Sequence, residues 1–168
     1  MLITEKSGNI NTTSVNGLEI DVVVVEWHET NKRILHKQTI SGVPVTLKFL
    51  KENPDLKDGD ILYRNENKII AVEINSCDCI VITPRNIPEA SAICYEIGNR
   101  HLPLFYENDE LLIPYETPIH NLLQVSGYDI KVEKRKLNNA FRTTVLPHLQ
   151  VAGADSLFSR ILQNTTSI

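Results

Sequence analysis

The fold of this chain can be read outward from NIPEASAICYEIGNRH, residues 86–101. The stretch begins as helices begin, with Pro88 in the first turn. Its apolar residues then recur at i, i+3, i+4 and i+7, which places on one helical face Ala90, Ile93, Cys94 and Ile97. Gly98 predicts the end of this helix, and His101 opens an expected strand over 101–106.

The segments around this helix alternate in a regular order. A strand is expected over 77–83, and after 101–106 come a polar turn and a return strand over 110–115. A second helix is expected to start with Thr117 as its cap and to end at Gly127 before a last strand over 128–132. Its apolar face is formed by Ile119, Leu122 and Leu123. The order βαββαβ predicts a ferredoxin-like domain.

The first half of the chain has a different pattern. It shows short apolar or alternating runs separated by turn signals, at 18–27, 34–35, 44–50, 61–63 and 69–74. No helical period interrupts them, so the pattern predicts a small all-β domain. The expected class is therefore α+β: an all-β domain over 1–75, a ferredoxin-like domain over 76–137, and a flexible C-terminal tail over 138–168.

Composition excludes several functions. The 168 residues carry a net charge of -4, and no basic half is present that would bind nucleic acid. No apolar run approaches the roughly 20 residues of a membrane span, and the N-terminus lacks the pattern of a signal peptide. Three cysteines are too few for a disulfide framework. These features predict a cytoplasmic protein that binds neither membranes nor nucleic acid.

The histidines are the first candidates for metal chemistry. Neutral imidazole suits nickel, zinc and copper, but one histidine cannot satisfy a first-row ion. A twofold homodimer would present His101 twice across its axis and so supply two nitrogen donors. The alternative is a hydrogen-bonded histidine at a helix–strand junction with no metal role, which the residues alone favour.

Other side chains are weaker candidates. His148 follows Pro147 in a stretch without a clear pattern, where it either completes a metal shell or is a surface residue. His120 lies one turn from Glu116 and is a possible ligand or a solvated helix-start residue. The remaining positions are interpreted chiefly as surface or core residues: His28, His36, Cys77, Cys79 and Cys94.

A family resemblance adds to this reading. The segments 25–27, 31–35 and 58–62, and above all Glu96-Ile97-Gly98-Asn99-Arg100-His101, resemble the UreE family of urease accessory proteins, which are nickel metallochaperones. The resemblance covers most of the chain. It implies a peptide- or partner-binding β domain followed by a ferredoxin-like domain that binds metal and dimerises.

The resemblance also implies roles for residues. His101 matches the central metal ligand of the family, and His148 resembles a single C-terminal histidine that completes the site in one subgroup. Two features depart from the family. Tyr115 and Thr117 stand where some relatives have a histidine pair, and residues 162–168 contain no histidine. Storage of several nickel ions is therefore not expected.

Two hypotheses follow. The first is a non-enzymatic, homodimeric nickel chaperone that holds Ni(II) between two copies of His101 and delivers it to apo-urease with the accessory GTPase UreG. Binding of Zn(II) or Cu(II) in vitro would be compatible with this role. The alternative is a dimeric interaction module without metal, whose β domain binds a peptide.

Overall fold

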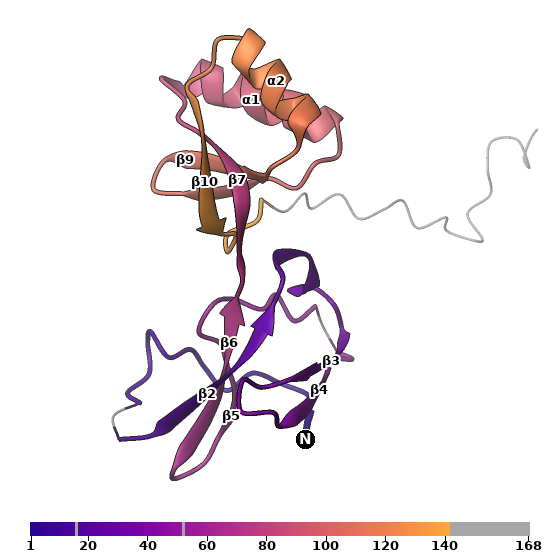
Figure 1. Ribbon diagram of the computed structural model, residues 1–168, viewed down its shortest axis with the longest axis vertical. Coiled ribbons are helices and arrows are strands. Elements are labelled where there is room, and N and C mark those ends of the chain that lie inside the picture. Colours follow the sequence, from indigo (N-terminus) through magenta and orange to yellow (C-terminus); the bar gives the residue numbers. More distant parts are fainter. Residues whose placement is uncertain (16, 52, 142–168) are drawn as a thin grey trace, which may run out of the picture.

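The computed structural model describes residues 1–15, 17–51 and 53–141, which form two bodies that follow one another along the chain (Figure 1). The first body contains β1 (Leu2–Ile3), β2 (Glu19–Val25), the 3-10 helix η1 (Trp27–Glu29), β3 (Ile34–Gln38), β4 (Pro44–Lys48), β5 (Ile61–Arg64) and β6 (Lys68–Ile74). The second contains β7 (Ser76–Ile82), α1 (Ile87–Asn99), β8 (Phe105–Glu107), β9 (Glu110–Pro114), α2 (Thr117–Val125) and β10 (Ile130–Lys136). The expected α+β class is confirmed.

The first body is built from two three-stranded sheets, in the orders β1-β4-β3 and β2-β6-β5. The β-branched run in β2 favours a strand, since such side chains pack well on a pleated surface, and alternate residues of the run face the core. Val23 and Val25 are fully buried against residues from both sheets, among them Leu47 and Ile74. The sequence pattern missed β1 and η1, because two or three residues are too few to show a period.

The second body has one four-stranded antiparallel sheet in the order β10-β7-β9-β8. Both helices cover the same face of this sheet (Figure 1). The apolar helix faces expected from the sequence supply its core, in which Ile93, Ile97, Ile119 and Leu123 are buried against β7 and β9. The order of elements confirms the ferredoxin-like fold.

The last strand differs from the expected one. It was expected over 128–132, whereas β10 spans Ile130–Lys136. Register with β7 explains the extension, because β10 pairs along the full length of that strand, from Ile130 opposite Ile82 to Lys136 opposite Ser76. Ion pairs also hold the basic end of β10: Arg135 contacts Glu133, Glu107 and Glu110.

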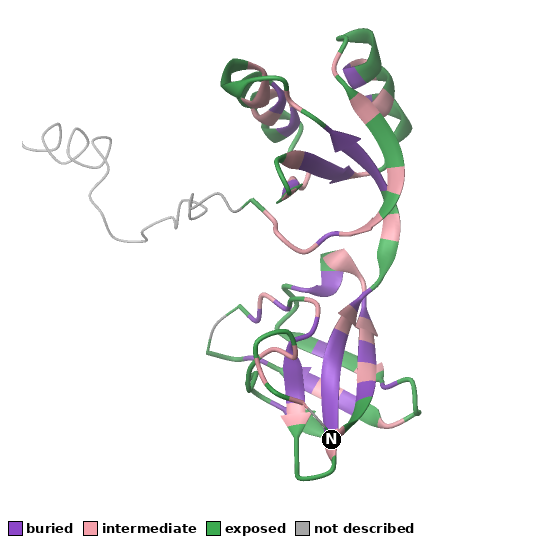
Figure 2. Ribbon diagram, turned by 90° about the vertical axis from the view of Figure 1, so that its left-hand side faces the viewer, coloured by how far each residue is buried: buried purple, intermediate pink, exposed green. Residues whose placement is uncertain are grey.

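The two bodies are connected closely. Only Asn75 separates β6 from β7, and its backbone N–H donates to the Val25 carbonyl over 2.9 Å. The rings of Trp27 and Phe105 meet edge to face with centroids 5.9 Å apart. Lys136 adds an ion pair with Asp58 at 3.0 Å. Figure 2 shows buried residues gathered in each body, so each has a core of its own.

One further observation concerns membranes. Within the part of the chain that the structure describes, no helix combines the length and the apolar composition needed to cross a bilayer.

Candidate metal centre

The start of α1 follows from its sequence. Asn86 is the N-cap, and its side-chain oxygen accepts a hydrogen bond from the Glu89 backbone N–H over 2.9 Å. Pro88 lies in the first turn, where its missing N–H is harmless. Glu89 also pairs with Arg85 at 2.6 Å. These contacts fix the start of α1. Together with the packing of its buried face, they determine where the helix ends and therefore where His101 lies.

The end of α1 differs from the sequence expectation. Gly98 was expected to stop the helix, but it lies within α1, and the helix continues to Asn99. The left-handed residue that ends it is His101, with φ +56°. The expected strand over 101–106 is correspondingly wrong at its start, because β8 begins at Phe105. This turn could not be predicted from the sequence, since left-handed positions after helices are usually glycine.

The backbone around His101 forms a Schellman motif. The His101 N–H donates to the Gly98 carbonyl over 2.9 Å, and the Leu102 N–H donates to the Ile97 carbonyl over 3.4 Å. Leu102 folds back onto the core that contains Ile97, which is the apolar contact typical of this motif. Hydrogen bonds thus fix the backbone at His101, although the residue is exposed to solvent.

The end of α2 uses the same motif with the usual residue. Gly127 has φ +74°, and its N–H donates to the Gln124 carbonyl over 3.1 Å. The Tyr128 N–H donates to the Leu123 carbonyl over 3.3 Å. Gly127 therefore ends α2 as expected, although the N-cap at its start is Glu116, one residue before the expected Thr117.

A shallow hollow adjoins His101. It has a volume of about 350 Å³ and is lined by residues from the end of α1 and the start of α2, among them Arg100, Leu102 and Glu116. Arg100 is anchored by a 2.5 Å ion pair with Glu96. The end of α1 therefore lies beside the start of α2, and the two residues on either side of His101 both face this hollow.

His120 is half-buried on α2. Its ring lies 5.6 Å from the ring of Tyr115, with an angle of 47° between the planes. The contact with Glu116 runs through the backbone, where the His120 N–H donates to the Glu116 carbonyl over 3.0 Å. The ring is thus in aromatic contact, and a ligand role for His120 stays a prediction.

The cysteines of β7 lie together. The sulfur atoms of Cys77 and Cys79 are 3.6 Å apart, on the sheet face that packs against Trp27. Burial raises the pKa of Cys79 to about 12 and also raises the pKa of Cys77. Burial therefore favours the protonated thiols, which agrees with the interpretation of these cysteines as core residues. Cys94 is half-buried against the helix–sheet core, as expected.

The other histidines are apart from the α1 end. His28 lies in η1 and His36 in β3, and both are exposed, as the sequence predicts. The His36 ring nitrogen Nδ1 lies 3.1 Å from the Thr46 hydroxyl. His148 lies outside the described residues. Within the described residues, no three side chains of His, Cys, Asp or Glu gather in a position to hold a metal ion.

The fold defines a two-domain protein, with an all-β domain followed by a ferredoxin-like domain. The second domain exposes His101 just after α1. The sequence profile of the UreE urease accessory protein, N-terminal domain, matches residues 3–75, and that of its C-terminal domain matches residues 77–155. The chain belongs to the UreE family of urease accessory proteins. The family is thus one of accessory proteins in urease maturation, and its name does not describe an enzyme.

Individual relatives agree with this membership. The urease accessory protein UreE of Flavobacterium johnsoniae is 41% identical over 96% of this chain and 98% of its own length. That of Acetivibrio thermocellus is 41% identical over 76% of this chain and 82% of its own. That of Staphylococcus epidermidis is 38% identical over 84% of this chain and 95% of its own. The likeness therefore extends over both bodies.

Proposed function

We propose that this protein is a nickel metallochaperone for urease. It captures Ni(II) as its cargo and hands the ion to the urease activation machinery, in which the GTPase UreG and apo-urease receive it for the dinuclear active site. Membership of the urease accessory family supports the maturation role. Carriage requires no catalytic step, so the protein acts by binding and release alone.

The observation that carries the proposal is the backbone of His101. A non-glycine residue in the left-handed region costs about 1–2 kcal/mol, and glycine would close the same motif without that cost. Residues held in such sparsely populated backbone conformations cluster at functional sites. His101 is exposed at this position, so its imidazole is offered to a ligand rather than to the core.

One imidazole is too few for the ion. In the proposed homodimer, His101 and His101 of the partner subunit face each other across the twofold axis, which doubles the donors without further sequence. His148 from the tail completes the shell. An exposed pair of imidazoles with an additional exchangeable ligand captures nickel and can still release it to a partner.

The remaining assignments follow from this model of carriage. Residues 76–137 bind metal and dimerise, residues 1–75 bind a partner, and residues 138–168 supply the further ligand. Copper outranks nickel at nitrogen sites, so selectivity arises from metal supply and from the partner, and Zn(II) or Cu(II) binds in vitro. The protein works in the cytoplasm, where the three cysteines stay reduced.

Calorimetric titration of the tag-free protein with Ni(II) tests the proposal. We expect about one tightly bound ion per dimer. His101→Ala and His101→Gly should each abolish tight binding, because both remove the central imidazole. His148→Ala should weaken it by roughly tenfold, as expected for a ligand that completes the shell.

The glycine variant is the matched control for folding. His101→Gly keeps the left-handed backbone and relieves its strain, so its thermal stability should be equal to or above that of the parent protein. Unchanged nickel affinity in this variant would refute the chaperone site. The chain would then be a dimeric interaction module, and its partner binding would be insensitive to chelators.

A further inference from the structure

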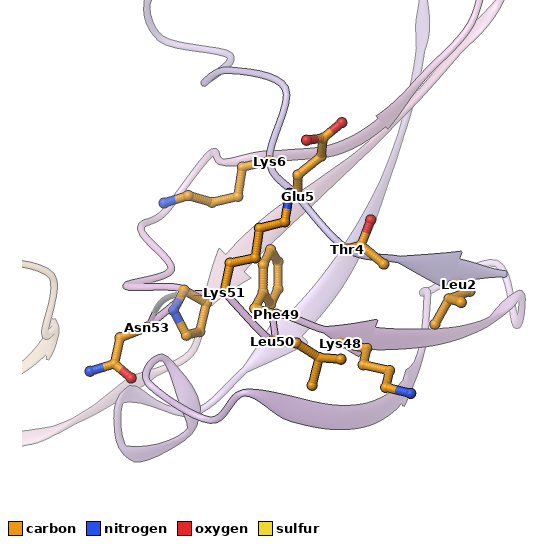
Figure 3. A pocket seen from close by; sticks show the side chains of 10 residues that line it. Leu2, Thr4, Glu5, Lys6, Lys48, Phe49, Leu50, Lys51 and Asn53 are labelled. Atoms are coloured by element: carbon orange, nitrogen blue, oxygen red, sulfur yellow. The ribbon is translucent and has the colours of Figure 1, made fainter.

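A groove in the first body lies apart from the metal centre. It has a volume of about 540 Å³ and runs beside β1 and the segment that follows β4 (Figure 3). Neither helix of the second body contributes to it. The proposed metal site therefore does not explain this groove.

The floor of the groove is apolar. Phe49 is buried beneath it, whereas Leu2 and Leu50 each expose 62% of their surface. Figure 3 shows Leu50 beside Phe49, with Lys48 between Leu50 and Leu2. Exposed leucines grouped around a cavity favour contact with an aliphatic side chain from another molecule.

The rim of the groove is cationic. Lys48 and Lys51 line it, and neither forms an ion pair with another described residue. Lys6 also lines it but is held by Asp60 at 2.8 Å. Glu5 is the acidic residue among the described residues that line the groove. Two unpaired ammonium groups on an acidic protein are complementary to an anionic ligand.

The groove also follows a free sheet edge. β1 is the edge strand of its sheet and pairs in parallel with β4. The Thr46 N–H donates to the Met1 carbonyl over 2.8 Å. Because backbone groups alternate along a strand, those of Leu2 and Thr4 face away from β4. Both residues line the groove, so an incoming strand would meet donors and acceptors there.

We propose that this groove binds an extended acidic segment of a partner protein. The segment adds a strand to the free edge of β1, places one aliphatic side chain on Leu2 and another on Leu50, and sets its carboxylates beside Lys48 and Lys51. This inference deepens the assignment of residues 1–75 as the partner-binding part and rests on it.

Three other occupants fit the groove less well, two because of their charge and one because of the free strand edge. The segment 142–168 of this chain carries two arginines and one aspartate, so it does not match a cationic rim. A second copy of the chain would offer β1 to β1 and bring like-charged lysines together. An anionic lipid surface matches the lysines but has no use for the unpaired strand edge.

The test is fluorescence anisotropy with the full-length, metal-free protein. The probe is a short dye-labelled peptide in which every second residue is aspartate or leucine in turn, with threonine at the positions between them, so that both kinds of side chain point to the same face of the added strand. We expect saturable binding that weakens about tenfold in the double variant Lys48→Glu, Lys51→Glu, because two exposed charge contacts reverse sign. Lys134→Glu, on the other body, is the matched charge control and should bind as the parent protein does.

A second probe isolates the strand edge. A peptide with the same side chains but N-methylated at alternate backbone positions cannot form the ladder and should bind at least tenfold more weakly. Equal binding of both probes, or no effect of the lysine reversals, overturns the proposal. So does tighter binding of a peptide copying residues 142–168 or of vesicles containing an anionic lipid.

The outcome is separable from that of the metal site. The lysine double variant should titrate with Ni(II) as the parent protein does, because its substitutions lie on the first body. Loss of peptide binding with intact nickel binding would therefore concern this groove alone. Failure of the nickel titration would concern the proposed metal site alone.

Discussion

The two helices of the second body end in the same backbone motif with different residues. At the end of α1 the left-handed position is occupied by His101, with φ +56°, and at the end of α2 by Gly127, with φ +74°. The hydrogen-bond pattern is equivalent at both ends. Folding alone is therefore satisfied by glycine, and the histidine requires another explanation.

Comparison of the two helix ends distinguishes the backbone motif, which they share, from the side chain, which differs. Both motifs return the chain onto a core residue one turn back, Ile97 for α1 and Leu123 for α2, and both of these are fully buried. What differs is the side chain presented to solvent. Gly127 is thus an internal reference against which the effect of the His101 side chain can be measured.

The largest effect should come from the residues that both motifs share. Ile97→Ala and Leu123→Ala each remove a fully buried side chain and should lower the free energy of unfolding by about 3 kcal/mol. Urea denaturation measures this, with the exposed Val125→Ala as the control, expected within about 0.5 kcal/mol. Very unequal costs would show that the two ends are not equivalent.

The next effect concerns nickel. A swap variant, His101→Gly with Gly127→His, keeps the composition but moves the imidazole to the other end of the helical layer, since the end of α1 lies beside the start of α2 (Figure 1). We expect nickel affinity to fall about a hundredfold. Calorimetry measures this, and retained affinity would mean that a histidine at either helix end suffices.

Gly127→Ala should have a smaller effect. Its φ of +74° is unfavourable for a residue with a Cβ atom, so we expect a loss of about 1 kcal/mol in unfolding free energy. Thermal denaturation followed by circular dichroism measures the change. No loss would indicate that left-handed backbone is cheap at these ends, which would weaken the argument from His101.

The smallest effect should be a gain. Gly98 lies within α1, and a Cβ atom built there meets nothing within 4 Å. Gly98→Ala should therefore stabilise the protein by about 0.5–1 kcal/mol, because alanine loses less backbone entropy in a helix. A loss measured in the same denaturation experiment would contradict the placement of Gly98 within the helix.

The sequence predicted the parts of the fold that depend on period. The apolar spacing of both helices and the βαββαβ order were sufficient for the ferredoxin-like half. The end of α1 was not predictable, because it is set by where Leu102 must turn back onto Ile97, a tertiary contact without a local signal. β1 was missed because two residues have no period.

The candidate site was predicted only as single residues. His101 was predicted as a candidate donor, but its left-handed backbone was not, since the usual glycine marker is absent there. A twofold site is a property of two chains and cannot be read from the spacing in one. The cationic groove was also missed, because Leu2 and Lys51 come together only when β1 pairs with β4.

The short connection between β6 and β7 has a mechanical consequence. Asn75 alone separates the two strands, and Trp27 packs against Phe105. These contacts hold the two bodies at a defined distance and orientation. A partner bound at the β1 edge would therefore lie at a defined distance and direction from the His101 imidazole of the same chain. In the proposed nickel transfer, the ion could then reach only those receiving groups of the partner that lie within that distance of His101.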